Sequence, residues 1–266
     1  MISLLTVDIF GFVRYNCNAM EKYVYIQPFN VRYCDVDFQD KLKPSSVLAF
    51  LEEAASNSAE QLGFGYSYIK PKNMAFIVTN VCCEFIRPVH LFDKDVHVRT
   101  WPLKPSYVVF GREYQLCVGD ETVMNATSRW CLLDMTDGKI LPSKMNENQD
   151  YSTYNTDRAL EIQKWKIERF PVEEGELRFT IKIANSEYDH NMHVNNTRYA
   201  DYCFNVFTLD ELKEMRLSYF SVAYVKQSYE DDVLSFYRKS IGDGAYLVQG
   251  VNQDGETVVQ AEIRFI

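Results

Sequence analysis

The chain contains the pattern E-T-V-x-x-A-x-x-R-aromatic twice, as "ETVMNATSRW" at Glu121–Trp130 and as "ETVVQAEIRF" at Glu256–Phe265. Each copy follows a turn that contains Gly and Asp, "VGD" before the first and "NQDG" before the second. The second strand of a β-hairpin commonly begins after such a turn. Because internal repetition indicates a duplicated structural unit, the pattern predicts two copies of one fold, each with a hairpin near its end.

A second pair of related segments lies upstream, one in each half. The first is "CDVDFQDKLKPSSVLAFLEEAA", which begins at Cys34, and the second is "SEYDHNMHVNNTRYADYCFNVF", which begins at Ser186. Both have two acids separated by one residue, then an amide, then an aliphatic residue, and both continue into a helical pattern. The matching residues are Asp35 and Glu187, Asp37 and Asp189, Gln39 and Asn191, and Leu42 and Val194.

Each half also has the same predicted order of elements. Residues 44–64, "PSSVLAFLEEAASNSAEQLGF", predict a helix, because apolar residues recur every three or four positions and Pro44 suits a first helical turn. The apolar face comprises Val47, Leu48, Leu51, Ala54, Ala55, Ala59 and Leu62. A second helix is expected from about Asn196. A strand-like run precedes each helix and about four follow it, which predicts an α+β fold with an antiparallel sheet wrapped around a central helix in each half.

The predicted halves run from 20 to 145 and from 176 to 266. Residues 146–175 form a polar linker, in which "TDRALEIQKWK" at 156–166 predicts a short helix. Residues 1–19 are interpreted as a leader or a non-core N-terminus, because Met20 opens a more regular stretch of sequence.

Composition and charge exclude several classes of protein. The chain has 266 residues, is 47% hydrophobic and has a formal net charge of −9, without a Lys/Arg-rich run, so nucleic acid is not an expected partner. No apolar run approaches the ~20 residues of a membrane span. Seven cysteines without a CxxC pair indicate free thiols in a cytoplasmic protein. Lys226, Arg238 and Lys239 form a small basic group, for which solvated strand ends are the simpler interpretation.

With its repeats and its length, the chain resembles the acyl-acyl-carrier-protein (acyl-ACP) thioesterases, which are double hot-dog proteins. The resemblance covers about Met20 to Ile266, and "VRYCDVDF" at 31–38 is similar to the start of single hot-dog thioesterases. Its most specific motif is D-x-N-x-H-V-N-N, formed by Asp189, Asn191, His193, Val194, Asn195 and Asn196 and followed by Tyr199.

The resemblance implies a tandem double hot-dog and hydrolysis of the thioester between a fatty acyl chain and the phosphopantetheine arm of acyl carrier protein. The second half would supply the catalytic residues and the first half would help to form the acyl pocket. No metal or redox cofactor is implied. Because one chain holds two hot-dog units, the expected state is a monomeric pseudo-dimer or a homodimer.

The residue types in the motif suit thioester hydrolysis. Asp189 is a candidate nucleophile or general base, and Asn191 could orient water or donate to the oxyanion. His193 could act as base or acid near neutral pH. A helix that starts after Asn195 and Asn196 would aim N–H groups at the site, with one of the two asparagines as its cap.

A purely structural interpretation competes with this one, because Asx-rich turns before helices are common. The first copy has Lys41 where the second has His193, and Lys43 with Pro44 in place of the two asparagines. The restriction of these side chains to one half favours chemistry. Asp37 remains a rival catalytic acid, since single hot-dog thioesterases use an acid there. His190 is interpreted as a turn residue.

The chain departs from the family at one expected catalytic position. A glutamate and a cysteine of the plant members correspond here to Gln227 and Ser228. Gln227 is kept as a candidate site residue, but an amide cannot act as a base. Either the role of the glutamate is orientation, or Glu230 substitutes, or activity is weak. Ser228 lies outside any GxSxG motif, which argues against a serine hydrolase.

Three other functions compete with this one. An acyl-CoA thioesterase would use the same chemistry with another carrier. A hot-dog dehydratase would need a differently spaced histidine motif, which is absent from the sequence. A non-catalytic acyl-binding protein is motivated by Gln227.

Overall fold

A computed structural model of the chain describes residues 22–146, 153–189 and 192–266. The predicted leader at 1–19, the predicted turn residue His190 and the candidate site residue Asn191 lie outside these residues. The first half contains β1 (Tyr25–Phe29), α1 (Pro44–Gln61), α2 (Tyr66–Ile69), β2 (Met74–Phe85), β3 (Val96–Pro102), β4 (Phe110–Val118), β5 (Glu121–Asp134) and β6 (Ile140–Leu141). The second half contains β7 (Glu176–Lys182), α3 (Asn196–Phe204), α4 (Leu209–Lys213), β8 (Leu217–Tyr224), β9 (Val233–Gly242), β10 (Ala245–Val251) and β11 (Thr257–Phe265).

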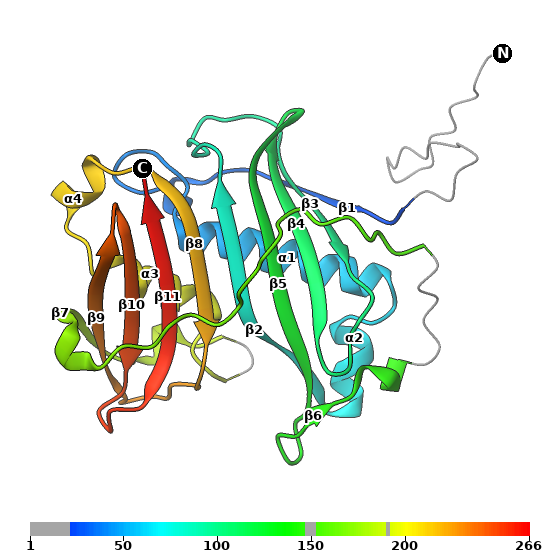
Figure 1. Ribbon diagram of the computed structural model, residues 1–266. Coiled ribbons are helices and arrows are strands. Elements are labelled where there is room, and N and C mark those ends of the chain that lie inside the picture. Colours follow the sequence, from blue (N-terminus) through cyan, green and yellow to red (C-terminus); the bar gives the residue numbers. More distant parts are fainter. Residues whose placement is uncertain (1–21, 147–152, 190–191) are drawn as a thin grey trace.

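All of these strands join one antiparallel sheet (Figure 1). The strand order is β1-β3-β4-β5-β2 in the first half and, counted from the other edge, β7-β9-β10-β11-β8 in the second. The halves meet where β2 pairs with β8, with Val81 opposite Val222. The repeated E-T-V segments lie in β5 and at the start of β11, which hold equivalent places beside the two central strands. This is the tandem double hot-dog fold that the resemblance implies.

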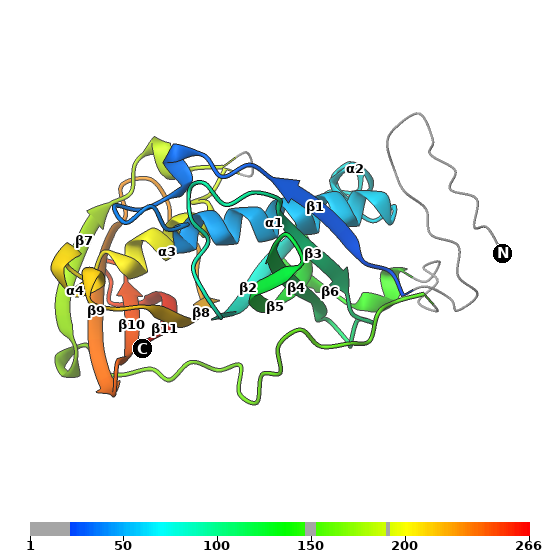
Figure 2. The ribbon, with the colours of Figure 1, turned by 90° about the horizontal axis from the view of Figure 1, so that it is seen from above.

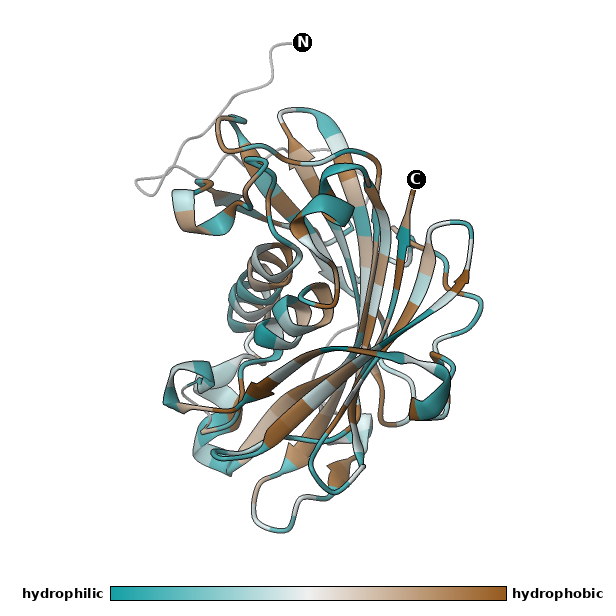
Figure 3. Cartoon of the chain, turned by 90° about the vertical axis from the view of Figure 1, so that its left-hand side faces the viewer, coloured by the Kyte–Doolittle hydropathy of each residue, from teal (hydrophilic) through white to brown (hydrophobic). Residues whose placement is uncertain are grey.

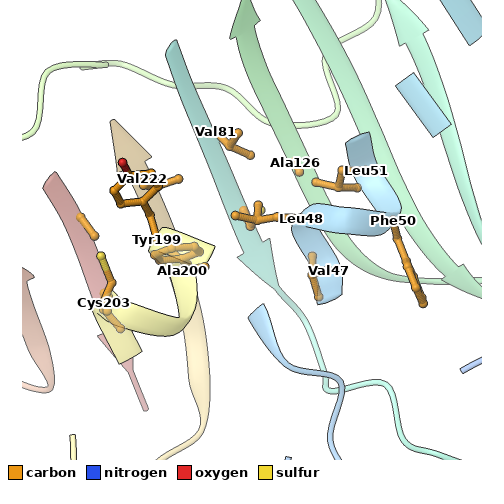
Figure 4. Close-up of a cluster of buried hydrophobic side chains, with 14 of the residues drawn as sticks. Val47, Leu48, Phe50, Leu51, Val81, Ala126, Tyr199, Ala200, Cys203 and Val222 are labelled. Carbon is orange, nitrogen blue, oxygen red and sulfur yellow. The ribbon is translucent and has the colours of Figure 1, made fainter. Parts of the chain in front are cut away.

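The sheet curves around α1 and α3, which lie on its concave side (Figures 2 and 3). Five of the seven residues predicted for the apolar face of α1 are buried, whereas Ala59 and Leu62 are only partly buried. In Figure 4, Leu48 of α1 and Tyr199 and Ala200 of α3 approach each other near Val81 of β2. Burial of each large aliphatic side chain contributes about 1.5–3 kcal/mol, so this packing holds the two halves together.

The linker between the halves does not contain the short helix predicted at 156–166. It runs as an extended chain across the convex face of the sheet (Figures 1 and 2). The fully buried carboxylate of Glu113 accepts hydrogen bonds from the backbone N–H groups of Ala159 and Leu160, at 2.9 and 3.3 Å. The indole of Trp101 donates to the Asp157 carbonyl at 3.0 Å. Because these bonds use backbone groups that a helix would need, tertiary contacts outweigh the local helical preference.

Two further features are the state of the cysteines and the character of the helices. The six cysteines among the described residues are free thiols, and all except Cys34 are buried. Within the same residues, none of the helices combines the length and the apolar character that crossing a membrane requires.

Candidate active site

A tight turn between β7 and α3 presents the second-half motif. The Asp189 N–H donates to the His193 carbonyl at 3.0 Å, and the Met192 N–H donates to the Asp189 carbonyl at 3.1 Å. A β-bridge between Tyr188 and Val194 closes the turn. Met192 has a φ of 63°, a left-handed conformation that lets the chain reverse within these few residues. The turn therefore places Asp189 and His193 just before the first residue of α3.

The first half forms the same turn with different side chains. The Asp37 N–H donates to the Lys41 carbonyl at 2.8 Å, and the Asp40 N–H donates to the Asp37 carbonyl at 3.1 Å. Val36 and Leu42 form the equivalent bridge, and Asp40 has a φ of 58°. The backbone geometry thus requires neither a histidine nor an asparagine pair. This argues against a purely structural reason for His193.

Asp189 and His193 lie side by side in the second turn. The Asp189 Oδ2 is 3.6 Å from the His193 Nδ1, and their side chains are only 10% and 19% exposed. The same ring nitrogen lies 3.4 Å from the Val194 carbonyl oxygen. A carboxylate at this distance attracts and orients an imidazolium ring, and low exposure strengthens the attraction.

Asn195 is the N-cap of α3, and Asn196 is its first residue. The Asn195 Oδ1 accepts hydrogen bonds from the N–H of Thr197 at 2.8 Å and from its hydroxyl at 2.7 Å. The Asn196 carbonyl accepts a hydrogen bond from the Tyr224 hydroxyl at 3.2 Å. Of the two asparagines that the sequence offers, Asn195 therefore has the capping role.

Gln227 lies in the loop between β8 and β9, which the hydrogen bond from the Glu230 N–H to the Tyr188 hydroxyl holds against the turn. Its exposed side chain accepts a hydrogen bond from the Tyr229 hydroxyl at 3.1 Å. This described hydrogen bond joins Gln227 to its own loop and not to the turn that holds Asp189 and His193. The neighbouring Ser228 is buried and bonded to the Tyr199 hydroxyl at 2.9 Å, as a structural serine would be.

A small cavity lies between the two halves, beside the start of α3. Its volume is about 20 Å³, which is room for about one water molecule, whereas ligand pockets commonly measure about 300–1,000 Å³. An acyl chain could therefore enter only if side chains moved. The lining residues are Leu48, Leu51, Glu52, Val78, Val81, Tyr114, Trp130, Asn196, Thr197 and Tyr224.

Glu52 is the cavity residue that the sequence interpretation missed. It lies on α1 of the first half, and partial burial raises the pKa of its carboxyl group, with the negative charge of Asp189 adding to the rise. Glu52 follows Leu48 by four positions and precedes Ala55 by three, so it shares the apolar face of the helix. The signal in the sequence that could have identified Glu52 is an acidic residue on the otherwise apolar face of this helix. Within the described ranges, no three His, Cys, Asp or Glu side chains are grouped to hold a metal ion.

The small basic group does not form an unpaired positive patch. Arg238 lies 2.7 Å from Glu211 and 3.5 Å from Glu176. Lys226 pairs with Glu256, and Lys239 pairs with Glu174. The neighbouring carboxylates therefore offset the charge of all three side chains.

Comparison with known proteins extends this picture. The model of the acyl-ACP thioesterase N-terminal domain matches residues 22–148, and that of the C-terminal domain matches residues 172–266. The chloroplastic acyl-[acyl-carrier-protein] hydrolase of Cuphea viscosissima is 20% identical over 78% of this chain and 53% of its own length. The chloroplastic palmitoyl-acyl carrier protein thioesterase of Arabidopsis thaliana is 22% identical over 86% of this chain and 58% of its own length. The chain thus spans little more than half the length of these relatives.

Two solved structures share the fold. An acyl-ACP thioesterase from Bacteroides thetaiotaomicron has a TM-score of 0.81 at 20% identity and covers 91% of this chain and 98% of its own. The 12:0-ACP thioesterase from Umbellularia californica has a TM-score of 0.80 at 16% identity and covers 95% and 99%. Since the two family models together match well over half of the residues, the chain belongs to the acyl-ACP thioesterase family.

Proposed function

We propose that the chain hydrolyses fatty acyl-acyl carrier protein, releasing a free fatty acid and the carrier with its free thiol. The position of Asp189 and His193 carries the proposal. These two side chains lie 3.6 Å apart in one of two otherwise matching turns, directly before the helix whose first residues line an apolar cavity. Family membership supports the same reaction.

The site supports a role for His193 at the leaving group. In the protonated form, its ring would be held by the Asp189 carboxylate and would donate a proton to the sulfur as the carbon–sulfur bond breaks. The sulfur leaves with the bonding electron pair, and the proton converts it to the thiol. Asn191 is the candidate donor to the carbonyl oxygen. Gln227, on the adjoining loop, is proposed only as an orienting group, because an amide cannot take a proton.

The cavity lining supports an acyl substrate. Leu48, Leu51, Val78 and Val81 would contact the methylene chain, which contributes about 0.8 kcal/mol for each buried CH₂ group. All four come from the first half, whereas Asp189 and His193 come from the second. The two halves are therefore both needed for one site, which supports a monomeric pseudo-dimer as the active unit.

The carrier is the part of the proposal that most needs a test, because the small basic group is paired with acids. Acyl-CoA is the alternative carrier. The buried free thiols support a reducing cytoplasm as the location.

The test is to measure fatty acid release from acyl-ACP and from acyl-CoA, each with short, medium and long chains. We expect a higher kcat/KM with acyl-ACP, and a loss of about 10²–10⁴-fold in His193→Ala. Faster turnover of acyl-CoA would show that coenzyme A, and not acyl carrier protein, is the preferred carrier. Failure to hydrolyse either substrate would remove the proposed function.

A further inference from the structure

Glu52 is a carboxylate in a place where a glutamate usually needs a partner. It stands on the apolar face of α1, between the buried residues Leu48 and Leu51 on one side and Ala55 on the other. Its side chain lines the cavity together with Asn196 and Thr197 of the second half. A carboxylate of the first half thus borders the helix start that follows the Asp189 turn.

Among the described residues, one acid and two tyrosines interact electrostatically with Glu52. Asp189 faces it from the turn before α3, Tyr114 from β4 and Tyr224 from β8. Burial raises the pKa of Tyr114 to about 12, and it raises the pKa of Tyr224 well above its ordinary value, so both stay neutral at physiological pH. Neither hydroxyl serves Glu52, because Tyr114 bonds to Ser128 and Tyr224 bonds to the Asn196 carbonyl.

The described residues offer the Glu52 carboxylate neither a hydrogen bond nor an ion pair. The fully buried Glu113 shows what a structural glutamate looks like in this fold. Its two oxygens accept hydrogen bonds from the Thr127 hydroxyl, the Arg158 guanidinium and two linker N–H groups. An unpaired carboxylate at a half-buried position costs stability, so fold maintenance does not account for Glu52.

We propose that Glu52 is the general base that takes a proton from the attacking water. This role rests on the proposed thioester hydrolysis and makes the site a joint product of both halves. Glu52 would also serve as the base, a role that the amide of Gln227 cannot fill. Partial burial and the charge of Asp189 raise the pKa of Glu52 above that of an ordinary glutamate, which makes it a stronger base near neutral pH.

With Glu52 as the base, every proton in the reaction is accounted for. Ionised Glu52 accepts a proton from water while the water oxygen bonds to the carbonyl carbon and the carbonyl electrons move to oxygen. When that carbonyl re-forms, the carbon–sulfur bond breaks and the sulfur, with the electron pair, takes a proton from protonated His193. The products are a carboxylic acid and a thiol. The proton on Glu52 then returns to His193 through solvent, which restores both groups.

The test compares Glu52→Gln with Glu53→Gln in the full chain. Glu53 is the adjacent, exposed residue of α1, so it matches the chemistry of the change without touching the cavity. We expect kcat on acyl-ACP to fall about 10²–10⁴-fold in the Glu52 variant, with little change in KM, and to stay at the wild-type value in the Glu53 variant.

The pH profile separates a base from a structural residue. A base must be ionised, so the wild-type rate should fall on the acidic side, at a higher pH than the value of 4.5 of an ordinary glutamate. Glu52→Gln should lose this limb, and Glu52→Asp should keep it at a reduced rate. The aspartate variant also gives an answer should the glutamine variant fail to fold.

The outcomes distinguish this inference from the proposed function. If the wild type hydrolyses acyl-ACP, and Glu52→Gln matches its rate and its pH profile, Glu52 is not the base although the function stands. If the wild type hydrolyses neither acyl-ACP nor acyl-CoA, the proposed function fails and the base assignment falls with it.

Discussion

Asp37 and Asp189 occupy the same position in two turns of matching backbone geometry, one in each half. Their side chains have different partners. The Asp37 Oδ1 accepts hydrogen bonds from the N–H groups of Gln39 at 2.8 Å and Lys41 at 3.0 Å. Asp189 faces the imidazole of His193 at 3.6 Å. The two turns thus share one backbone geometry. The acid of the first copy is hydrogen-bonded to its own turn, whereas the acid of the second copy lies next to an imidazole.

This difference predicts that Asp37→Asn leaves acyl-ACP hydrolysis close to the wild-type rate. An amide oxygen can accept the same two backbone hydrogen bonds as the carboxylate, so the turn should keep its shape. Asp37→Ala should instead lower the free energy of unfolding by about 1–3 kcal/mol, because it removes the acceptor. The two variants are compared by steady-state kinetics and urea unfolding. A large loss of activity in a folded Asp37→Asn protein would make Asp37 the catalytic acid.

The cap of α3 gives a second prediction. Asn195→Ala should lower the free energy of unfolding by about 1 kcal/mol, because the Thr197 N–H loses its acceptor. For a protein of this size, this corresponds to a fall in Tm of about 2–4 °C. Asn195→Asp is the matched control and should stay near the wild-type Tm, since both side chains cap well. An unchanged Tm in the alanine variant would contradict the capping role.

The linker should depend on Glu113. Glu113→Ala leaves the N–H groups of Ala159 and Leu160 without their acceptor and Arg158 without its ion pair. We expect a loss of about 2–4 kcal/mol in urea unfolding and faster proteolysis within residues 153–171. Glu168→Ala, which removes an exposed acid paired with Lys164 at the surface, is the control and should change neither measurement. Equal protease resistance of both variants would show that other contacts hold the linker.

Glu52 also predicts how stability changes with pH. A carboxyl group whose pKa is raised on folding contributes stability below its unfolded value of 4.5, and that contribution is lost as the pH rises through the folded value. Glu52→Gln should therefore raise Tm at neutral pH, and the gain should vanish below pH 4.5. Thermal unfolding at several pH values checks this. A lower Tm of Glu52→Gln at neutral pH would mean that the ionised carboxylate stabilises the fold.

Much of the fold is predictable from the sequence because its signals are local or repeated. The E-T-V copies identify β5 and β11, and the spacing of Leu48, Leu51 and Ala55 identifies the buried face of α1. The extended linker is not predictable in this way, since its conformation depends on Glu113, more than forty residues away.

The residues of the candidate site show the same difference between local signals, which the sequence reveals, and long-range contacts, which it does not. Asp189 and His193 are found from a motif within one turn, and the structure places them together. Glu52 is missed because its place beside Asn196 and Thr197 arises only when α1 of the first half packs against α3 of the second half. Gln227 is a candidate from resemblance alone, and its described hydrogen bond is to Tyr229.

The most direct test of the account is the rate of fatty acid release from acyl-ACP by the wild type and by Asp189→Asn, with thermal unfolding to show that both are folded. We predict measurable hydrolysis by the wild type and a fall of about 10²–10⁴-fold in the variant. Equal rates in the two folded proteins would contradict the placement of the active site at Asp189.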